Sequence, residues 1–180
     1  GILSALPNAA GLIQQSLGCG TADFSKGPAM SLAQVEAGLA LGRHAARQHI
    51  FAGCDVLLLG EMGIANTSSA AALLAAATDL PIETCVGRGT GISDAQFALK
   101  LSLIKQALQR PYAKDPLSVL AEFGGFELVQ LCGAILGAAS LQKPVLIDGF
   151  IVSVAALIAC QLAPNCRDYL IFTSDVVLGY

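Results

Sequence analysis

Residues 56–72 read VLLLGEMGIANTSSAAA, which has the pattern of a strand, a turn and the start of a helix in succession. The apolar run ends at Gly60, and the small polar residues Asn66, Thr67 and Ser68 are typical of a helix start. Glu61 stands between them, at the tip of a strand that its neighbours predict to be buried. A strand that leads through a turn into a helix is the repeating unit of α/β domains.

Further helix starts and strand-length apolar runs follow along the chain. Ser31-Leu-Ala-Gln34 and Ser93-Asp-Ala-Gln96 are capping boxes, and Asp115 precedes a proline as an N-cap precedes N1. The predicted strands are residues 55–60, 81–86, 144–147 and 169–173. The predicted helices are residues 31–48, 67–77, 93–108, 116–123, 126–139 and 151–162.

Strands and helices alternate from residue 55 onward, which predicts an α/β fold with a doubly wound, mostly parallel sheet and helices on both faces. The 180 residues suit one domain with a sizeable core. Prolines and glycines make residues 1–30 a loop-rich entry segment, and residues 31–180 are expected to form an α/β substrate-binding core domain.

Composition excludes several classes of protein. The net charge is −3 and no basic run occurs, so we expect no nucleic-acid partner. The six cysteines include no CxxC pair, and His44 and His49 lie five residues apart, so we expect no metal site and reduced thiols. Asp148 interrupts the most apolar window, residues 145–163, and no basic signal-peptide region begins the sequence, so we expect a cytoplasmic protein without membrane spans.

The turn after the first strand has the features of an anion site. Ligands of open α/β sheets bind at the carboxyl ends of strands, and free N–H groups at a helix start favour phosphate or carboxylate. Gly63 lets a backbone approach such a ligand. The alternative is an ordinary turn with Asn66 or Ser68 as N-cap, but that alternative does not explain Glu61.

Two later segments invite similar alternatives. Residues 86–100, VGRGTGISDAQFALK, contain a glycine-rich turn that lacks the spacing of a dinucleotide fingerprint or a Walker loop. This turn is either a sugar-phosphate site or a structural loop, and Lys100 either serves it or lies on an exposed helix face. Asp148 in PVLIDGF repeats the position of Glu61, and it either borders a ribose or cationic ring or caps the next helix.

The whole chain resembles one family, the nicotinate-nucleotide:dimethylbenzimidazole phosphoribosyltransferases of cobalamin biosynthesis. The segments that carry the resemblance keep a consistent order over nearly the whole length of the chain. They are GTADFSKGPAMS (20–31), LLGEMGIANTSSAAA (58–72), VGRGTGISDAQFALK (86–100), FGGFELVQLCGAILGAA (123–139), PVLIDGF (144–150) and RDYLI (167–171).

The resemblance implies transfer of the 5-phosphoribosyl group from nicotinate mononucleotide to 5,6-dimethylbenzimidazole. It implies no metal or cofactor, two small-molecule substrates and a homodimer. It also implies that Glu61 has a supporting catalytic role and that Glu61 and Asp148 border the substrate pocket. The substrate- and phosphate-binding positions that it implies are Gly63, Ala65, Asn66, Thr67, Ser68, Gly87, Gly89, Lys100 and Asp148.

The sequence departs from the family in three places. It contains neither the Gly-Glu-Gly-Ser-Gly motif, whose Glu is the family's general base, nor the N-terminal Asp-His-Gly motif, and FTSDVVLGY follows Ile171 where the family reads toward Ser-His-x-Ser-Ala-Glu. The chain is therefore expected to match the central portion of the enzyme, with the base supplied by an absent segment or another chain. Two alternatives are a non-catalytic module that binds a nucleotide or sugar phosphate, and a structural α/β domain that dimerises through its alanine-rich helices.

Overall fold

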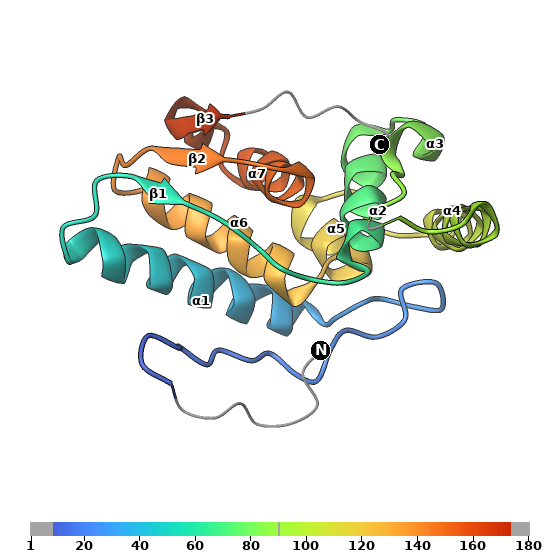
Figure 1. The fold of residues 1–180 in the computed structure, drawn as a ribbon, viewed down its shortest axis with the longest axis horizontal. Coiled ribbons are helices and arrows are strands. Elements are labelled where there is room, and N and C mark those ends of the chain that lie inside the picture. Colours follow the sequence, from blue (N-terminus) through green and yellow to red (C-terminus); the bar gives the residue numbers. More distant parts are fainter. Residues whose placement is uncertain (1–8, 90, 174–180) are drawn as a thin grey trace.

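The computed structural model describes residues 9–89 and 91–173, and its small sheet lies at one edge of a largely helical domain (Figure 1). The elements in chain order are α1 (Leu32–Phe51), β1 (Leu57–Leu58), α2 (Asn66–Thr78), α3 (Ile82–Cys85), α4 (Asp94–Leu108), α5 (Pro116–Phe123), α6 (Phe126–Ala139), β2 (Val145–Ile147), α7 (Phe150–Leu162), the 3-10 helix η1 (Pro164–Tyr169) and β3 (Leu170–Phe172).

The described strands form one parallel sheet in the order β1-β2-β3. Val145 of β2 stands in register with Leu57 on one side and with Leu170 on the other. Val145 and Ile147 are buried, and both α6 and α7 pack against β2. The predicted α/β class, a parallel sheet with helices packed on it, is confirmed, although each strand is shorter than the apolar run that predicted it.

The strand predicted over residues 81–86 is wrong, because this segment forms the helix α3. Ile82 and Cys85 are both buried, and residues three apart share one face of a helix but point to opposite faces of a strand. The hydroxyl of Thr84 also donates to the carbonyl of Pro81, 2.7 Å away, in the pattern of a helical turn. Consequently the described residues between β1 and β2 form α2, α3, α4, α5 and α6, and they include no other strand.

The three helix starts for which the sequence predicts a side-chain cap are confirmed. Ser31 and Ser93 each close a capping box with the glutamine three residues later. Asp115 caps α5 by accepting a hydrogen bond from the Ser118 amide at 3.0 Å, and Pro116 occupies the first helical position. These starts depend on contacts within four residues, which explains why the sequence predicts them well.

Helices α1 and α6 lie side by side along much of their length (Figure 1). Glycines bring the two backbones together: a Cβ on Gly42 would lie 1.9 Å from the carbonyl oxygen of Gln130, and one on Gly133 would lie 2.2 Å from that of Leu39. Such close contacts admit no side chain at either position. The two helices are therefore packed backbone against backbone at these positions.

The entry segment before α1 is fastened to α5. The Met30 amide donates to the Ala121 carbonyl at 3.0 Å, and the Arg110 guanidinium donates to the Phe24 carbonyl at 3.0 Å. Arg110 also forms an ion pair with Glu122 at 2.8 Å. These contacts hold the segment GTADFSKGPAMS against the helical part of the molecule.

The apolar window 145–163 divides into β2 and α7 around Asp148 and Gly149, as its interruption predicted. Within residues 9–89 and 91–173, no helix combines the length and the apolar character needed to cross a lipid bilayer.

Candidate functional site

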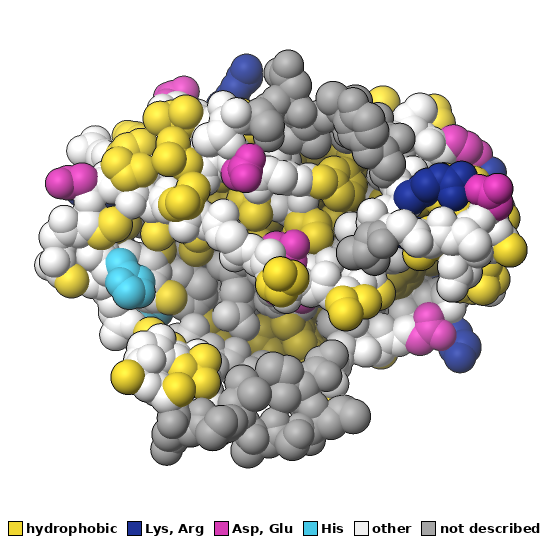
Figure 2. All heavy atoms as spheres, viewed as in Figure 1, with side chains coloured by type: hydrophobic (Ala, Val, Ile, Leu, Met, Phe, Trp, Pro, Cys, Tyr) yellow, Lys and Arg dark blue, Asp and Glu magenta, His cyan; other side chains and the backbone are white. Residues whose placement is uncertain are grey.

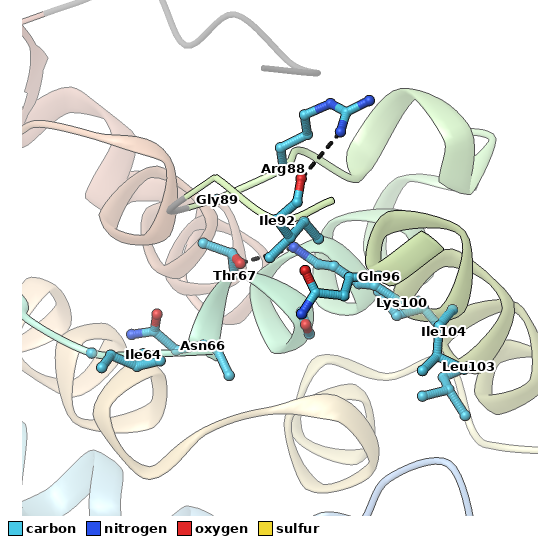
Figure 3. A pocket seen from close by; sticks show the side chains of 14 residues that line it. Ile64, Asn66, Thr67, Arg88, Gly89, Ile92, Gln96, Lys100, Leu103 and Ile104 are labelled. Carbon is cyan, nitrogen blue, oxygen red and sulfur yellow. Dashed lines mark hydrogen bonds between the residues drawn. The ribbon is translucent and has the colours of Figure 1, made fainter. Parts of the chain in front are cut away.

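A pocket of about 360 Å³ opens between the start of α2, the loop before α4 and one face of α4 (Figure 3). Seven of the predicted site residues line it: Gly63, Ala65, Asn66, Thr67, Ser68, Gly89 and Lys100. The lining also includes Ile64, Arg88, Ile92, Gln96, Leu99, Leu103 and Ile104, which were not predicted. Segments on either side of α3 therefore meet at one cavity.

The N-terminus of α2 has no side-chain cap. Its N-cap residue is Ala65, with φ 71°, rather than the Asn66 or Ser68 that an ordinary turn would use. The amide of the Asn66 side chain donates instead to the Glu61 carboxylate. The first N–H groups of a helix have no acceptor within the helix, and they carry the positive end of its dipole. At the start of α2 the Ser68 amide donates to the Ala65 carbonyl at 3.1 Å, so the donors that this helix start offers to the pocket are the N–H groups before Ser68.

Lys100 extends from α4 toward this helix start, as Figure 3 shows. Its ammonium group donates to the Thr67 hydroxyl at 2.9 Å and to the Gly87 carbonyl at 2.9 Å. The side chain is half-buried, and this burial lowers the pKa of Lys100 below its ordinary value. Among the described residues, no carboxylate forms an ion pair with it. A cation with two neutral partners is well placed to attract an anion.

The glycine-rich turn approaches Thr67 closely. Gly89 has φ +65°, and a Cβ there would lie 3.2 Å from the Thr67 hydroxyl oxygen. Arg88 beside it is engaged elsewhere, because its guanidinium pairs with Asp94 at 2.5 Å and lies 5.2 Å from the centre of the Phe97 ring. Gly89 thus leaves room beside Thr67, and the positive charge nearest to that hydroxyl is the ammonium group of Lys100.

Apolar side chains form another wall of the pocket. Ile64 is 91% exposed, and Leu99 and Leu103 of α4 are 58% and 41% exposed. The sequence carried a signal for this wall: Leu99 and Leu103 lie four residues apart on one face of α4, whereas the core-facing side chains Leu101, Ile104 and Leu108 lie on another. An exposed apolar wall beside polar donors is typical of a site for a ligand with both an aromatic and a charged part.

Glu61 is not among the residues that line the pocket. Its side chain instead stabilises the turn before α2. Its carboxylate accepts from Asn66, and Gly63 makes room for this contact because a Cβ there would lie 2.4 Å from the Asn66 side-chain nitrogen. Glu127, in the first turn of α6, was not predicted. Burial raises the pKa of Glu127, and the negative charge of Glu61 raises it further. Figure 2 shows acidic and hydrophobic side chains next to one another near the centre of the molecular face drawn there.

Asp148 follows β2 as predicted but does not line the pocket. It is exposed and accepts a hydrogen bond from the Thr173 hydroxyl at 2.8 Å. The helix α7 has Gly149, with φ 79°, as its N-cap and no side-chain cap, so Asp148 does not cap it. Gly87 likewise does not line the pocket, but its carbonyl positions Lys100.

A parallel α/β domain whose pocket joins a helix N-terminus to a half-buried lysine has the features of the α/β domains that bind anions. Residues 2–176 match a family model described as Phosphoribosyltransferase, and the chain belongs to that family. The family predicted from the sequence is therefore confirmed.

Named relatives give the same result. The chain is 52% identical over 172 residues to the nicotinate-nucleotide--dimethylbenzimidazole phosphoribosyltransferase of Vibrio cholerae serotype O1, a match that covers 96% of this chain and 50% of that protein. The protein of that name from Shewanella amazonensis is 51% identical over 174 residues, covering 96% and 51%. The crystal structure of CobT from Thermus thermophilus superposes with a TM-score of 0.90 at 40% identity, covering 96% and 52%. The chain spans about half the length of the relatives it matches.

Proposed function

We propose that this protein takes part in phosphoribosyl transfer from nicotinate mononucleotide to 5,6-dimethylbenzimidazole, which gives nicotinate and α-ribazole 5′-phosphate. The relatives are named for a nicotinate nucleotide and dimethylbenzimidazole. The observation that carries the proposal is the pocket in which the ammonium group of Lys100 meets the uncapped start of α2 beside an apolar wall.

The 5′-phosphate binds at the polar end of this pocket. Lys100 supplies a positive charge, Thr67 and Ser68 supply hydroxyls, and the backbone from Gly63 to Asn66 supplies N–H donors. The dipole of α2 favours the same negative charge. Gly89 keeps the cavity open beside Thr67. The apolar side chains Ile64, Leu99 and Leu103 lie beside this end and suit an aromatic ring.

In the proposed reaction a nitrogen of dimethylbenzimidazole attacks the anomeric carbon of the ribose. The bond from that carbon to the pyridinium nitrogen breaks, and its electron pair neutralises the pyridinium, so nicotinate leaves without added protonation. The benzimidazole N–H proton passes to a base, and the configuration at the anomeric carbon is inverted. The tasks of the protein are to hold the phosphate, align the two rings and accept this proton.

Glu61 acts in this scheme as a supporting residue that orients Asn66 and the turn before α2. Asp148 lies outside this pocket, after the strand β2 that neighbours β1, and we propose that it contacts the second substrate. We assign the general base to the family's Gly-Glu-Gly-Ser-Gly motif, which this sequence does not contain and which further polypeptide or a partner subunit would supply. We further propose that the protein works as a homodimer in the cytoplasm.

A calorimetric titration of this chain with nicotinate mononucleotide tests the proposal. We expect saturable binding of nicotinate mononucleotide. Ribose 5-phosphate should compete with it and nicotinate alone should not, because the phosphate makes most of the contacts that determine affinity. Addition of dimethylbenzimidazole, with chromatography of the products, then tests transfer. If nicotinate competes and ribose 5-phosphate does not, the assignment of this pocket to the phosphate is wrong.

A further inference from the structure

Two cysteines, one in the last turn of α7 and one in η1, lie in contact outside the pocket described above. Cys160 is in the last turn of α7, and Cys166 is in η1. The Cys166 thiol donates to the Cys160 sulfur, with 3.5 Å between the two sulfur atoms. A disulfide has a sulfur–sulfur distance of about 2.05 Å, so the atoms need to approach by about 1.5 Å. Both are free thiols in this structure.

The two thiols differ in their access to solvent. Cys160 is half-buried, whereas Cys166 is only 3% exposed. Burial raises the pKa of Cys166 to about 12, so Cys166 is a protonated thiol at neutral pH. A dissolved reagent therefore meets Cys160 first, and Cys166 is already beside it.

A third thiol near this pair is engaged elsewhere. Cys132 of α6 is fully buried, and its thiol donates to the Ala155 carbonyl at 3.1 Å. The sulfur contact that the structure records among the described cysteines joins Cys160 to Cys166. This contact defines which pair would react.

We propose that Cys160 and Cys166 form an intramolecular disulfide when the protein meets a low-molecular-weight disulfide such as glutathione disulfide. The Cys160 thiolate attacks glutathione disulfide and forms a mixed disulfide, with release of one glutathione thiolate. The Cys166 sulfur then attacks the Cys160 sulfur and releases the second glutathione, which takes up the proton lost by Cys166. Two protein thiols are oxidised, and one glutathione disulfide is reduced to two glutathione molecules.

The bond would fasten η1 to the end of α7. Because η1 leads directly into β3, the cross-link would also restrain the edge strand whose end carries Thr173, the partner of Asp148. In a reducing compartment the thiols stay free, so the cross-link reports a shift to oxidising conditions.

The test incubates the folded chain with glutathione disulfide, blocks free thiols with an alkylating reagent and maps the peptides by mass spectrometry. We expect the peptide that carries both cysteines to lose two hydrogens, to escape alkylation at both positions and to recover on treatment with dithiothreitol. In Cys166→Ser we expect the mixed disulfide of Cys160 with glutathione to accumulate, because the second attack is lost. In Cys160→Ser we expect Cys166 to remain unmodified, because it is buried.

Cys132→Ala is the control, and it should leave the cross-link unchanged. Cys166→Ala replaces Cys166→Ser if the serine variant does not fold, as judged by circular dichroism. The proposal is overturned if the unsubstituted protein keeps the mixed disulfide at Cys160 as persistently as Cys166→Ser does, or if Cys132 enters the cross-link.

Discussion

The ammonium group of Lys100 lies 2.9 Å from the hydroxyl oxygen of Thr67, a residue 33 positions earlier in the sequence. This contact joins α4 to the first turn of α2, and the Gly87 carbonyl holds the same ammonium group from a third segment. The positive charge therefore stands beside the helix N-terminus before any ligand arrives. Preorganised donors of this kind lose little freedom when an anion binds.

Gly89→Ala should weaken the binding of ribose 5-phosphate. The new Cβ would lie 3.2 Å from the Thr67 hydroxyl, and alanine is strained at φ +65°. Gly91→Ala is the matched control, because Gly91 has φ +92° but nothing within 4 Å of its Cβ position. Calorimetry should show a loss of about tenfold or more for Gly89→Ala relative to Gly91→Ala, in line with a lost charge-assisted hydrogen bond. Equal losses would mean that backbone strain alone matters and that the turn does not adjoin the ligand.

The affinity for ribose 5-phosphate should fall in the alkaline range at a lower pH than an ordinary lysine would produce. Burial lowers the pKa of Lys100, so its charge disappears as pH rises through that lowered value, and the attraction for phosphate disappears with it. Titrations between about pH 7 and pH 10.5 measure the effect, the upper limit being near the ordinary lysine pKa. Lys100→Arg stays charged throughout this range and should lack the fall. The same fall in Lys100→Arg would assign it to another group.

Glu61→Gln should lower the pKa of Glu127. The charge of Glu61 is one of the causes that raise this pKa, and burial is the larger cause, so the value should fall only part of the way to that of an ordinary glutamate. Glutamine retains an oxygen that can accept from Asn66, so the substitution removes charge while keeping the turn. NMR titration of the side-chain carboxyl carbon measures the change, and Glu83→Gln, on the surface helix α3, serves as control. An unchanged pKa in Glu61→Gln would show that the two carboxylates do not interact.

Gly42→Ala should destabilise the protein, although alanine normally stabilises a helix. Its Cβ would lie 1.9 Å from the Gln130 carbonyl oxygen, which forces α1 and α6 apart. We expect the free energy of unfolding to fall by about 1–3 kcal/mol, as in overpacked cores. Denaturant unfolding measures this fall, with Gly27→Ala as control because nothing lies within 4 Å of its Cβ position. A gain in stability for Gly42→Ala would contradict the close packing.

The parts of the fold that depend on neighbours in the sequence were predictable. Ser31 and Ser93 begin helices because their caps lie three residues away, and the break at Asp148 separates β2 from α7. The prediction of a strand at residues 81–86 was wrong because a short apolar run suits either a strand or a helix. The burial of residues three apart, which indicates a helix, depends on the packing of the folded molecule.

The candidate site was only partly predictable for a related reason. Lys100 and Thr67 could each be singled out from local patterns, but their contact joins α4 to α2 across the intervening helix α3 and its flanking loops. Leu99 and Leu103 formed an apolar face whose role depends on what lies opposite. The hydrogen bond from the Thr173 hydroxyl to the Asp148 carboxylate depends on the pairing of β3 with β2, and that pairing is a long-range property of the fold.

In the proposed function, Lys100 and the start of α2 bind the phosphate of nicotinate mononucleotide. The most direct test compares the affinity of Lys100→Met with that of Lys105→Met. Lys105 lies on the same helix, but it pairs with Glu83 on the surface, so both variants lose one positive charge from α4. We predict that Lys100→Met weakens binding about tenfold or more, as loss of a charge-assisted hydrogen bond does, and that Lys105→Met leaves it nearly unchanged. Equal affinities in the two variants, with both folded, would show that Lys100 does not bind the phosphate.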